Sequence, residues 1–298
     1  HMMMDVRFSI LDKYVEKFIV TESIYSHSGK KKKLNFDINN YPKFKDKISY
    51  IIIDEEPEDI IGLKNGLAKP HEKRSDSLKR INLSYDYMIK AIDKASDNDL
   101  IILSDNDEIP NLKSKQFKNS NKNIIIFKQL FFYYKFNLFY DLMPWFGTKA
   151  CKKKKLVSLS WLRNLKNKKY PWWRIDTYFS DTKQTNVQIV TDGGWHFTNL
   201  KTAEEIHKKL SNFGHHNEYD ESGLTVKDIQ FCIDNKIVNY NHLADKSDSN
   251  KYTAEYKLKL VNDEILPKFL GTFLYFFYVI IDCIKTKIQP IHIFRTRY

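Results

Sequence analysis

Cysteine is scarce in this chain of 298 residues, and the three that occur are Cys151, Cys232 and Cys283. Their wide spacing excludes a disulfide framework and a cysteine-based zinc site. The spacing favours a reducing, cytoplasmic setting, while a Golgi-type lumen stays open as the alternative. The sequence contains no recognisable signal peptide.

Long apolar runs are also missing. The uncharged, aromatic stretch at residues 269–281 has 13 residues, whereas a membrane-spanning helix needs about 20. We therefore expect no transmembrane span. We expect the stretch to form a C-terminal helix docked on the body of the protein; a helix that makes weak contact with a membrane surface is the alternative.

Glycine-rich phosphate-binding motifs are absent as well. The chain has neither a Gly-x-x-x-x-Gly-Lys-Ser/Thr loop nor a Gly-x-Gly-x-x-Gly turn. A phosphate ligand would therefore have to be held by a metal ion and by basic side chains, such as Arg80 on an expected helix. The net charge of +12, from 49 basic and 37 acidic residues, suits an anionic ligand or partner.

The most informative stretch that is present is an acidic motif after a short apolar run. The run Leu100 to Leu103 reads as a buried strand, and Asp105, Asp107 and Glu108 follow it. Carboxylates at the carboxyl end of a core strand lie where open α/β sheets bind ligands. Asp105 and Asp107 are two residues apart and could both bind one hard divalent cation. Solvated acidic turns are common, however, so the Asp-x-Asp pattern alone is weak.

Helices and strands alternate in the first 110 residues, which predicts an α/β fold with a parallel sheet. The predicted elements are a helix over 3–12, strands over 15–21 and 48–53, a helix over 72–95 and the strand before the acidic motif. Further on we predict one long strand over 124–134, a strand over 187–190, a turn over 214–220 and capped helices after Thr202 and Thr225. No linker or repeat divides the chain, so we expect a single domain.

A second cluster is Gly193-Gly194-Trp195-His196, which we place at a strand end. Paired glycines let a ligand approach the backbone closely, and Trp195 offers a flat face for a sugar ring. His196 is a candidate third metal ligand beside Asp105 and Asp107. The plainer alternative is that Trp195 is a core aromatic residue and His196 caps a turn.

These two motifs together resemble those of glycosyltransferase family 17, which includes the enzyme that adds the bisecting N-acetylglucosamine to N-glycans. Smaller matches follow in the same order along nearly the whole chain. They are Asp5-Val6-Arg7-Phe8, Phe18 to Ser23, His27 to Lys30, Leu34-x-Phe36, Arg80, Gly147-Thr148, His216-x-Glu218-Tyr219 and Leu266-Pro267. The ordered set is more specific than any single motif.

The resemblance implies a GT-A-like fold, a Rossmann-type mixed sheet flanked by helices. It also implies an inverting, metal-dependent transfer of N-acetylglucosamine from UDP-N-acetylglucosamine to a glycan hydroxyl, β-1,4 to mannose. Residues 1–110 would form the nucleotide-sugar half and residues 111–298 the acceptor-side half, which includes the docking helix. Another UDP-sugar or acceptor is the alternative.

Site roles follow from the motifs and the resemblance. The Asp-x-Asp motif with His196 would bind Mn²⁺ or Mg²⁺. Glu22 and Ser23 end a strand that we expect beside the metal strand, where a base or ribose could bind. The expected donor-binding residues are Glu22, Ser23, Lys30, Arg80, Asp105, Glu108 and Trp195. Glu218 is the first choice for the general base, and Asp192 is the second.

Two other classes share some of these features. A metal-dependent phosphohydrolase or nuclease would also cluster acids, but it would typically need a fuller carboxylate set for two metals. A nucleic-acid-binding protein would explain the charge and the aromatics, but not an acidic strand end. We therefore expect no nucleic-acid partner.

Overall fold

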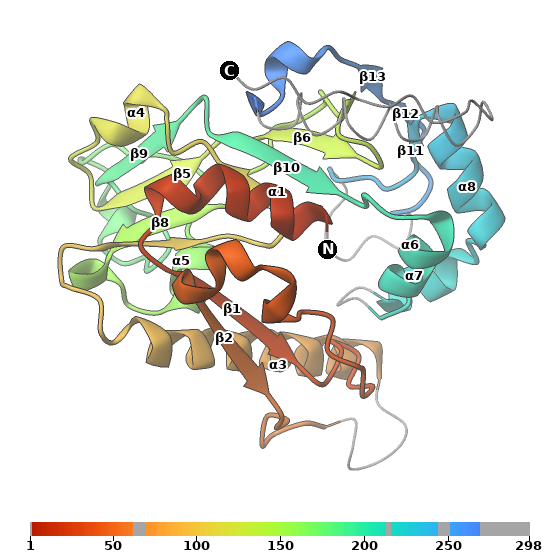
Figure 1. Ribbon diagram of the computed structural model, residues 1–298, viewed down its shortest axis with the longest axis horizontal. Coiled ribbons are helices and arrows are strands. Elements are labelled where there is room, and N and C mark those ends of the chain that lie inside the picture. Colours follow the sequence, from red (N-terminus) through yellow and green to blue (C-terminus); the bar gives the residue numbers. More distant parts are fainter. Residues whose placement is uncertain (1, 62–68, 213–215, 244–250, 269–298) are drawn as a thin grey trace, which may run out of the picture.

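The computed structural model describes residues 2–61, 69–212, 216–243 and 251–268 (Figure 1). The side chains of residue 70 and residues 216–218 also lie outside the description. The expected docking helix at residues 269–281 falls outside the described residues. Within the described ranges, no helix has the length and apolar character needed to cross a membrane.

The described chain is a mixed α/β protein with several sheets flanked by helices, which confirms the α/β part of the predicted fold. Its strands are β1 Phe18–Ser23, β2 Ile48–Ile53, β3 Leu100–Leu103, β4 Glu108–Pro110, β5 Ile124–Phe127, β6 Leu130–Tyr133, β7 Leu138–Phe139, β8 Lys149–Lys152, β9 Val187–Val190, β10 Gly194–Thr198, β11 Ile237–Val238, β12 Tyr256–Lys257 and β13 Lys259–Leu260. Its α-helices are α1 Met2–Leu11, α3 Pro70–Ile92, α4 Lys115–Lys118, α5 Leu159–Asn164, α6 Ala203–Leu210, α7 His216–Ser222 and α8 Val226–Asn235. Short 3₁₀ helices lie at Asp12–Tyr14, Ile38–Asn40, Pro42–Lys47, Lys153–Lys155, Ile175–Thr177 and Asp263–Ile265.

The strands form several small sheets instead of the one parallel sheet that we predicted. β1 and β2 form a parallel pair, with Phe18 opposite Ile48 and Ser23 opposite Ile53. A four-stranded sheet has the order β3-β8-β5-β9, and a five-stranded sheet has the order β13-β7-β6-β10-β4. β3 is antiparallel to β8 and belongs to a different sheet from β1. We expected β1 to lie beside β3, the strand before the acidic motif, in one sheet. This prediction is wrong, because the strand hydrogen bonds place β1 and β3 in different sheets.

The predicted strand over 124–134 is in fact two strands in different sheets. β5 pairs with β9, and β6 pairs with β10, both in parallel. The segment from β5 to β6 and the segment from β9 to β10 pass from one sheet to the other side by side. They are joined there by two bonds, from Lys128 N–H to the Val190 carbonyl at 2.9 Å and from Gly193 N–H to the Lys128 carbonyl at 3.0 Å. A Cβ atom at Gly193 would lie 2.5 Å from the Lys128 nitrogen, so the crossing requires glycine there.

Helix α1 lies between the strand groups and forms the centre of the largest core cluster. Phe8 is 1% exposed and packs against Phe18 and Phe44, with ring centroids 4.7 and 5.6 Å apart. The same cluster includes Ile109 of β4 and Phe197 of β10. Helix α1 therefore connects the β1–β2 pair to the five-stranded sheet. Helix α3 lies against β1 and β2 (Figure 1).

The predicted helix starts at Thr202 and Thr225 are confirmed. Each threonine side chain accepts from the backbone N–H three residues on, and the acid at that position caps the threonine N–H in return. The predicted turn over 214–220 is wrong, because α7 occupies His216–Ser222.

Candidate active site

The acidic motif forms the connection between β3 and β4. Asp105 is exposed, the Asp107 side chain is 23% exposed, and Glu108 is fully buried as the first residue of β4. β4 pairs with β10 in antiparallel register, so that His196 lies opposite Glu108, and Phe197 N–H donates to the Asp107 carbonyl at 2.8 Å. The motif is therefore held by β10, the strand that contains His196.

Arg7 of α1 holds the backbone of the motif. Its guanidinium donates to the Asp105 carbonyl at 2.9 Å, to the Ser104 hydroxyl at 2.6 Å and to the Glu108 carbonyl. Burial lowers the pKa of Arg7, and the nearby carboxylates of Glu108, Asp105 and Asp107 oppose that shift. One side chain from the first turns of the chain thus fixes the turn that presents the carboxylates.

Glu108 has a structural environment. Its Oε1 accepts from Trp145 Nε1 at 2.6 Å, and its Oε2 accepts from Thr148 Oγ1 at 2.8 Å and from Asp105 N–H at 3.2 Å. A Cβ atom at Gly147 would overlap this carboxylate. Burial and the nearby Asp105 raise the pKa of Glu108 to about 8. Glu108 therefore links the acidic motif to Trp145 and Thr148 in the protein interior and does not face solvent.

Asp105 is engaged by a basic residue of α5. Arg163 Nη2 lies 2.6 Å from Asp105 Oδ2, and Arg163 Nη1 donates to the Gly147 carbonyl at 3.1 Å. Burial acts to lower the pKa of Arg163, but the nearby Asp105 and Glu108 raise it by more, so its pKa is above the usual value. The guanidinium therefore stays charged beside the motif.

Asp107 faces His196. The Asp107 Oδ1 and His196 Nδ1 atoms are 3.6 Å apart, which is too far for a hydrogen bond. His196 is 4% exposed and its ring stacks on Trp145, with centroids 4.3 Å apart and planes 10° apart. Its Nδ1 has no hydrogen-bond partner among the described residues. Burial lowers the pKa of His196 to about 3, so the imidazole is neutral, the form that binds metals.

No set of three or more His, Cys, Asp or Glu side chains in the described ranges converges in a metal-binding arrangement. Asp107 and His196 are adjacent, whereas Asp105 bonds to Arg163. The fit to a divalent ion therefore rests on one carboxylate and one buried, unbonded imidazole nitrogen, with a second carboxylate close by.

Lys209 of α6 adds a further positive charge. Its Nζ donates to Asn199 Oδ1 at 3.0 Å. Burial lowers the pKa of Lys209, and the nearby carboxylates of Asp107 and Asp105 oppose that shift. Burial also raises the pKa of Asp107, while Lys209, Arg7 and Arg163 oppose that shift. The site is thus a group of carboxylates surrounded by cations from three separate elements.

The loop after β1 contains His27, which is exposed and lies within electrostatic range of the Asp105 carboxylate. The predicted donor residue Arg80 holds this loop, because it forms two bonds to Glu56 and donates to the His27 carbonyl at 3.0 Å. Lys30, another predicted donor residue, is exposed on the same loop.

Glu22 and Ser23 have local partners. Glu22 accepts from Lys32, from the backbone N–H groups of Asn35 and Phe36, and from the Tyr50 hydroxyl. Burial acts to raise the pKa of Glu22, but these bonds outweigh burial and hold the pKa below its usual value. Ser23 Oγ accepts from the Tyr25 N–H at 3.0 Å. In this structure Glu22 anchors residues 32–36 to β1.

The second motif follows the end of β9, as predicted, but Gly194, Trp195 and His196 themselves begin a further strand, β10. Neighbouring side chains of a strand point to opposite faces, so Trp195 points away from His196. Trp195 packs against the α1 core cluster and its Nε1 donates to the Ile265 carbonyl at 2.6 Å. The structure therefore brings His196, and not Trp195, to the acidic motif.

The two predicted bases lie in different places. Asp192 accepts from Ser114 Oγ at 2.6 Å, and it precedes His196 by four residues, about 13 Å of extended chain. It therefore lies at the opposite end of β10 from the acidic motif. Glu218 is in α7, but its side chain lies outside the described residues.

Four residues of the site were not assigned a role from the sequence: Arg7, Trp145, Arg163 and Lys209. Arg7 occurs in the sequence analysis only as part of a matched segment. Each reaches the motif from a distant part of the chain, so no local spacing could have identified it.

The model of glycosyltransferase family 17 matches residues 2–246 of the chain. This span includes every element that contributes to the site, and the protein belongs to glycosyltransferase family 17. It is therefore a glycosyltransferase, an enzyme that uses a sugar donor and an acceptor, and the predicted family and enzyme class are confirmed. No curated protein and no solved structure matches the chain.

Proposed function

We propose that this glycosyltransferase transfers N-acetylglucosamine from UDP-N-acetylglucosamine to a glycan hydroxyl, with inversion and in β-1,4 linkage to mannose. The observation that carries the proposal is the acidic motif, in which Asp107 lies beside the unbonded His196 nitrogen and near Arg7, Arg163 and Lys209. Another UDP-sugar or acceptor at the same site is the alternative.

We also propose a GT-A-like arrangement, in which residues 1–110 bind the nucleotide sugar and residues 111–298 face the acceptor. Two features support it. Asp105 is one of the charges that act on His27 in the loop after β1. Arg163 of α5 bonds to Asp105, and Lys209 of α6 acts on Asp107.

A divalent ion, Mn²⁺ or Mg²⁺, would be held by Asp107 and His196, with Asp105 as the further carboxylate. The imidazole nitrogen favours Mn²⁺ over Mg²⁺, because Mg²⁺ is bound almost entirely through oxygen. When bound, such an ion supplies charge that neutralises the leaving diphosphate. Arg163 bonds to Asp105 in this structure, so it is placed to exchange that carboxylate for a phosphate oxygen.

Lys209 is placed to bind the same diphosphate, because its ammonium is desolvated and faces Asp107. Lys30 is exposed on the loop that Arg80 holds, and it is a candidate for an outer phosphate contact. We therefore assign Arg80 to positioning the loop, and Arg163 and Lys209 to charge stabilisation.

Inversion needs a general base on the acceptor side, and we keep Glu218 of α7 for this role. Glu218→Gln should lower turnover by about 100-fold or more, the scale expected for a positioned base, with UDP affinity unchanged. Glu221→Gln on the same helix is the matched control. Normal turnover of Glu218→Gln would exclude Glu218 as the base.

The function is tested by a donor screen that measures UDP release from a panel of UDP-sugars with a mannose-containing acceptor, with and without Mn²⁺. We expect the highest turnover with UDP-N-acetylglucosamine, its loss with EDTA, and its recovery with Mn²⁺. Asp107→Ala should abolish turnover in a folded protein, whereas Asp86→Ala, an exposed acid of α3, should not.

Ligand binding can be measured separately from turnover. UDP with Mn²⁺ at about 100 times the dissociation constant should add about 2.7 kcal/mol to the free energy of unfolding. Stabilisation by GDP- or CMP-sugars and not by UDP-sugars would contradict the donor assignment. Full turnover by Asp107→Ala would contradict the metal assignment.

A further inference from the structure

A large apolar surface lies outside the candidate active site. It is formed by residues 170–179, here called the aromatic loop. Five of its side chains are strongly exposed: Trp172 74%, Trp173 66%, Ile175 72%, Tyr178 75% and Phe179 86%. Val157, which is 75% exposed, is a further large apolar side chain on the described surface. Soluble proteins rarely expose this many large apolar residues in one segment, and such patches mark interaction sites.

The aromatic loop is held in its exposed conformation by specific bonds. Asp176 forms ion pairs with Arg174 and Lys183, both at 2.7 Å. The base of the loop is closed by backbone bonds, from Lys166 N–H to the Thr182 carbonyl at 2.9 Å and from Tyr170 N–H to the Gln184 carbonyl at 3.4 Å. The apolar side chains therefore point outward from a structured loop.

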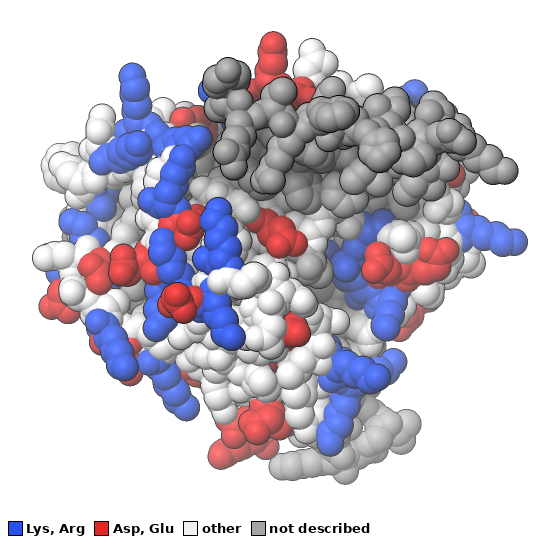
Figure 2. Space-filling model, viewed as in Figure 1, with Lys and Arg blue, Asp and Glu red and all other residues white. Residues whose placement is uncertain are grey.

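The surroundings of the loop are basic. Residues 166–183 contain five basic and two acidic residues, a net charge of +3. The Asp176 carboxylate is engaged by Arg174 and Lys183, whereas Lys166, Lys168 and Lys169 are exposed and form no ion pair with any described residue. Elsewhere, basic and acidic side chains are interspersed on the face shown in Figure 2. The lysines of this segment thus leave positive charge unneutralised next to an apolar surface.

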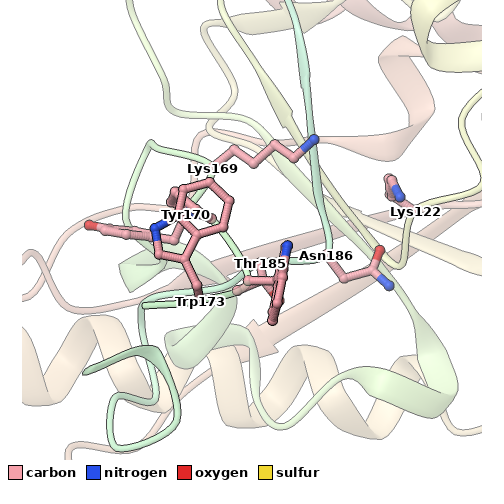
Figure 3. A pocket seen from close by; sticks show the side chains of 8 residues that line it. Lys122, Lys169, Tyr170, Trp173, Thr185 and Asn186 are labelled. Carbon is pink, nitrogen blue, oxygen red and sulfur yellow. The ribbon is translucent and has the colours of Figure 1, made fainter. Parts of the chain in front are cut away.

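A shallow recess of about 530 Å³ lies at the base of the loop. Tyr170 and Trp173 lie on one side of it, Lys122 and Asn186 lie on the other, and Lys169 extends along its edge (Figure 3). Aromatic rings next to ammonium groups suit a ligand that has both an apolar part and an anionic group.

The loop is well separated from the acidic motif. Leu103 and Ile126 both lie opposite Lys149 in the four-stranded sheet. Asp105 is two residues beyond this level, and Lys122 is four residues before it. Six residues of strand span about 20 Å. A partner on the aromatic loop would therefore leave the candidate active site free.

We propose that the aromatic loop binds the surface of an anionic membrane, with Trp172, Trp173 and Phe179 at the headgroup–acyl boundary and the lysines on the lipid phosphates. Trp and Tyr favour this boundary because one part of each ring system is apolar and another is polar. Flanking lysines add attraction to anionic lipids. A protein partner fits less well, since protein interfaces are depleted in lysine. A sugar ligand would use one or two rings, not the exposed Ile175 and Phe179 as well.

The test is co-sedimentation of the full chain with vesicles of phosphatidylcholine alone and of phosphatidylcholine with 30% phosphatidylglycerol. We expect binding to the anionic vesicles that weakens with salt, and a blue shift of the tryptophan fluorescence on binding. Trp172→Ser/Phe179→Ser should weaken vesicle binding at least tenfold. Phe231→Ser, at a residue of α8 that is 61% exposed, should not. Lys166→Gln/Lys168→Gln/Lys169→Gln should remove the preference for anionic lipid. A circular dichroism melt checks that each variant is folded.

Two outcomes would overturn the proposal. Vesicle binding that survives the Trp172→Ser/Phe179→Ser substitutions would place the membrane contact elsewhere in the chain. Absence of vesicle binding, together with tryptophan quenching by soluble oligosaccharides that Trp172→Ser reduces, would identify a sugar subsite instead. Neither measurement depends on the donor or the metal, so failure here is distinct from failure of the proposed transferase reaction.

Discussion

Arg7 offers the sharpest test of how the fold builds the acidic motif. Its guanidinium bridges the carbonyls of Asp105 and Glu108 and the hydroxyl of Ser104. Arg7→Met removes the three contacts and keeps most of the apolar stem of the side chain. Arg7→Lys keeps the charge, but one ammonium cannot reproduce the planar geometry that reaches all three acceptors.

The size of the effect follows from which acceptors water can reach. The Glu108 carbonyl belongs to a fully buried residue, so losing its donor should cost about 1–3 kcal/mol. Asp105 is exposed and can be hydrated again, so its loss should cost less. Removing the positive charge also leaves the neighbouring carboxylates of Asp105 and Asp107 less compensated. We therefore expect Arg7→Met to lower the free energy of unfolding by about 2–4 kcal/mol, and Arg7→Lys to lower it by less.

The assay is urea denaturation followed by circular dichroism, with turnover measured in parallel on the folded protein. Arg174→Met is the matched control, because Arg174 is exposed and its solvated ion pair with Asp176 should contribute little to stability. We expect Arg7→Met to lose both stability and activity, since Asp105 and Asp107 lose their fixed backbone. Stability within about 0.5 kcal/mol of the wild type, with unchanged turnover, would show that Arg7 does not hold the motif.

Three further substitutions test the remaining parts of the site. Trp145→Phe keeps a ring against His196 but removes the N–H that donates to Glu108. A urea titration should therefore show that the free energy of unfolding falls by about 1–2 kcal/mol, and an unchanged midpoint would contradict this. Burial and Asp105 raise the pKa of Glu108 to about 8, so the folded metal-free protein retains a proton that the unfolded chain releases above about pH 4.5. Its free energy of unfolding should therefore fall as pH rises from about 4.5 to 8, and Glu108→Gln should flatten that slope; equal slopes in the two proteins would refute the assignment. Lys209→Gln should raise the dissociation constant of UDP by about tenfold, equivalent to about 1.4 kcal/mol, as measured by isothermal titration calorimetry. Lys208→Gln, on the exposed side of α6, is the control and should leave the dissociation constant unchanged. Equal UDP affinities of the two variants would show that Lys209 does not bind the diphosphate.

The sequence alone was enough to predict the features that depend on local patterns. The α/β class, the strands at Ile48–Ile53 and Val187–Val190, and the capped starts of two helices all follow from hydrophobic periodicity and capping residues. The family could also be inferred, because the two main motifs and most of the smaller matches occur within the span matched by the family model. Each of these signals is a short local pattern that can be read without knowing the fold.

Only the tertiary structure decided the partners of each motif. No local pattern shows that the apolar run over 124–134 changes sheets at Lys128, since the change depends on a close backbone contact with Gly193. The strand register likewise places His196 opposite Glu108 and turns Trp195 to the other face. Arg7, Trp145 and Arg163 bond to residues of the acidic motif from positions between 37 and 101 residues away. Such contacts form only because the core packing of α1 and the two larger sheets brings distant segments together, which is why the cations of the site were not found from the sequence.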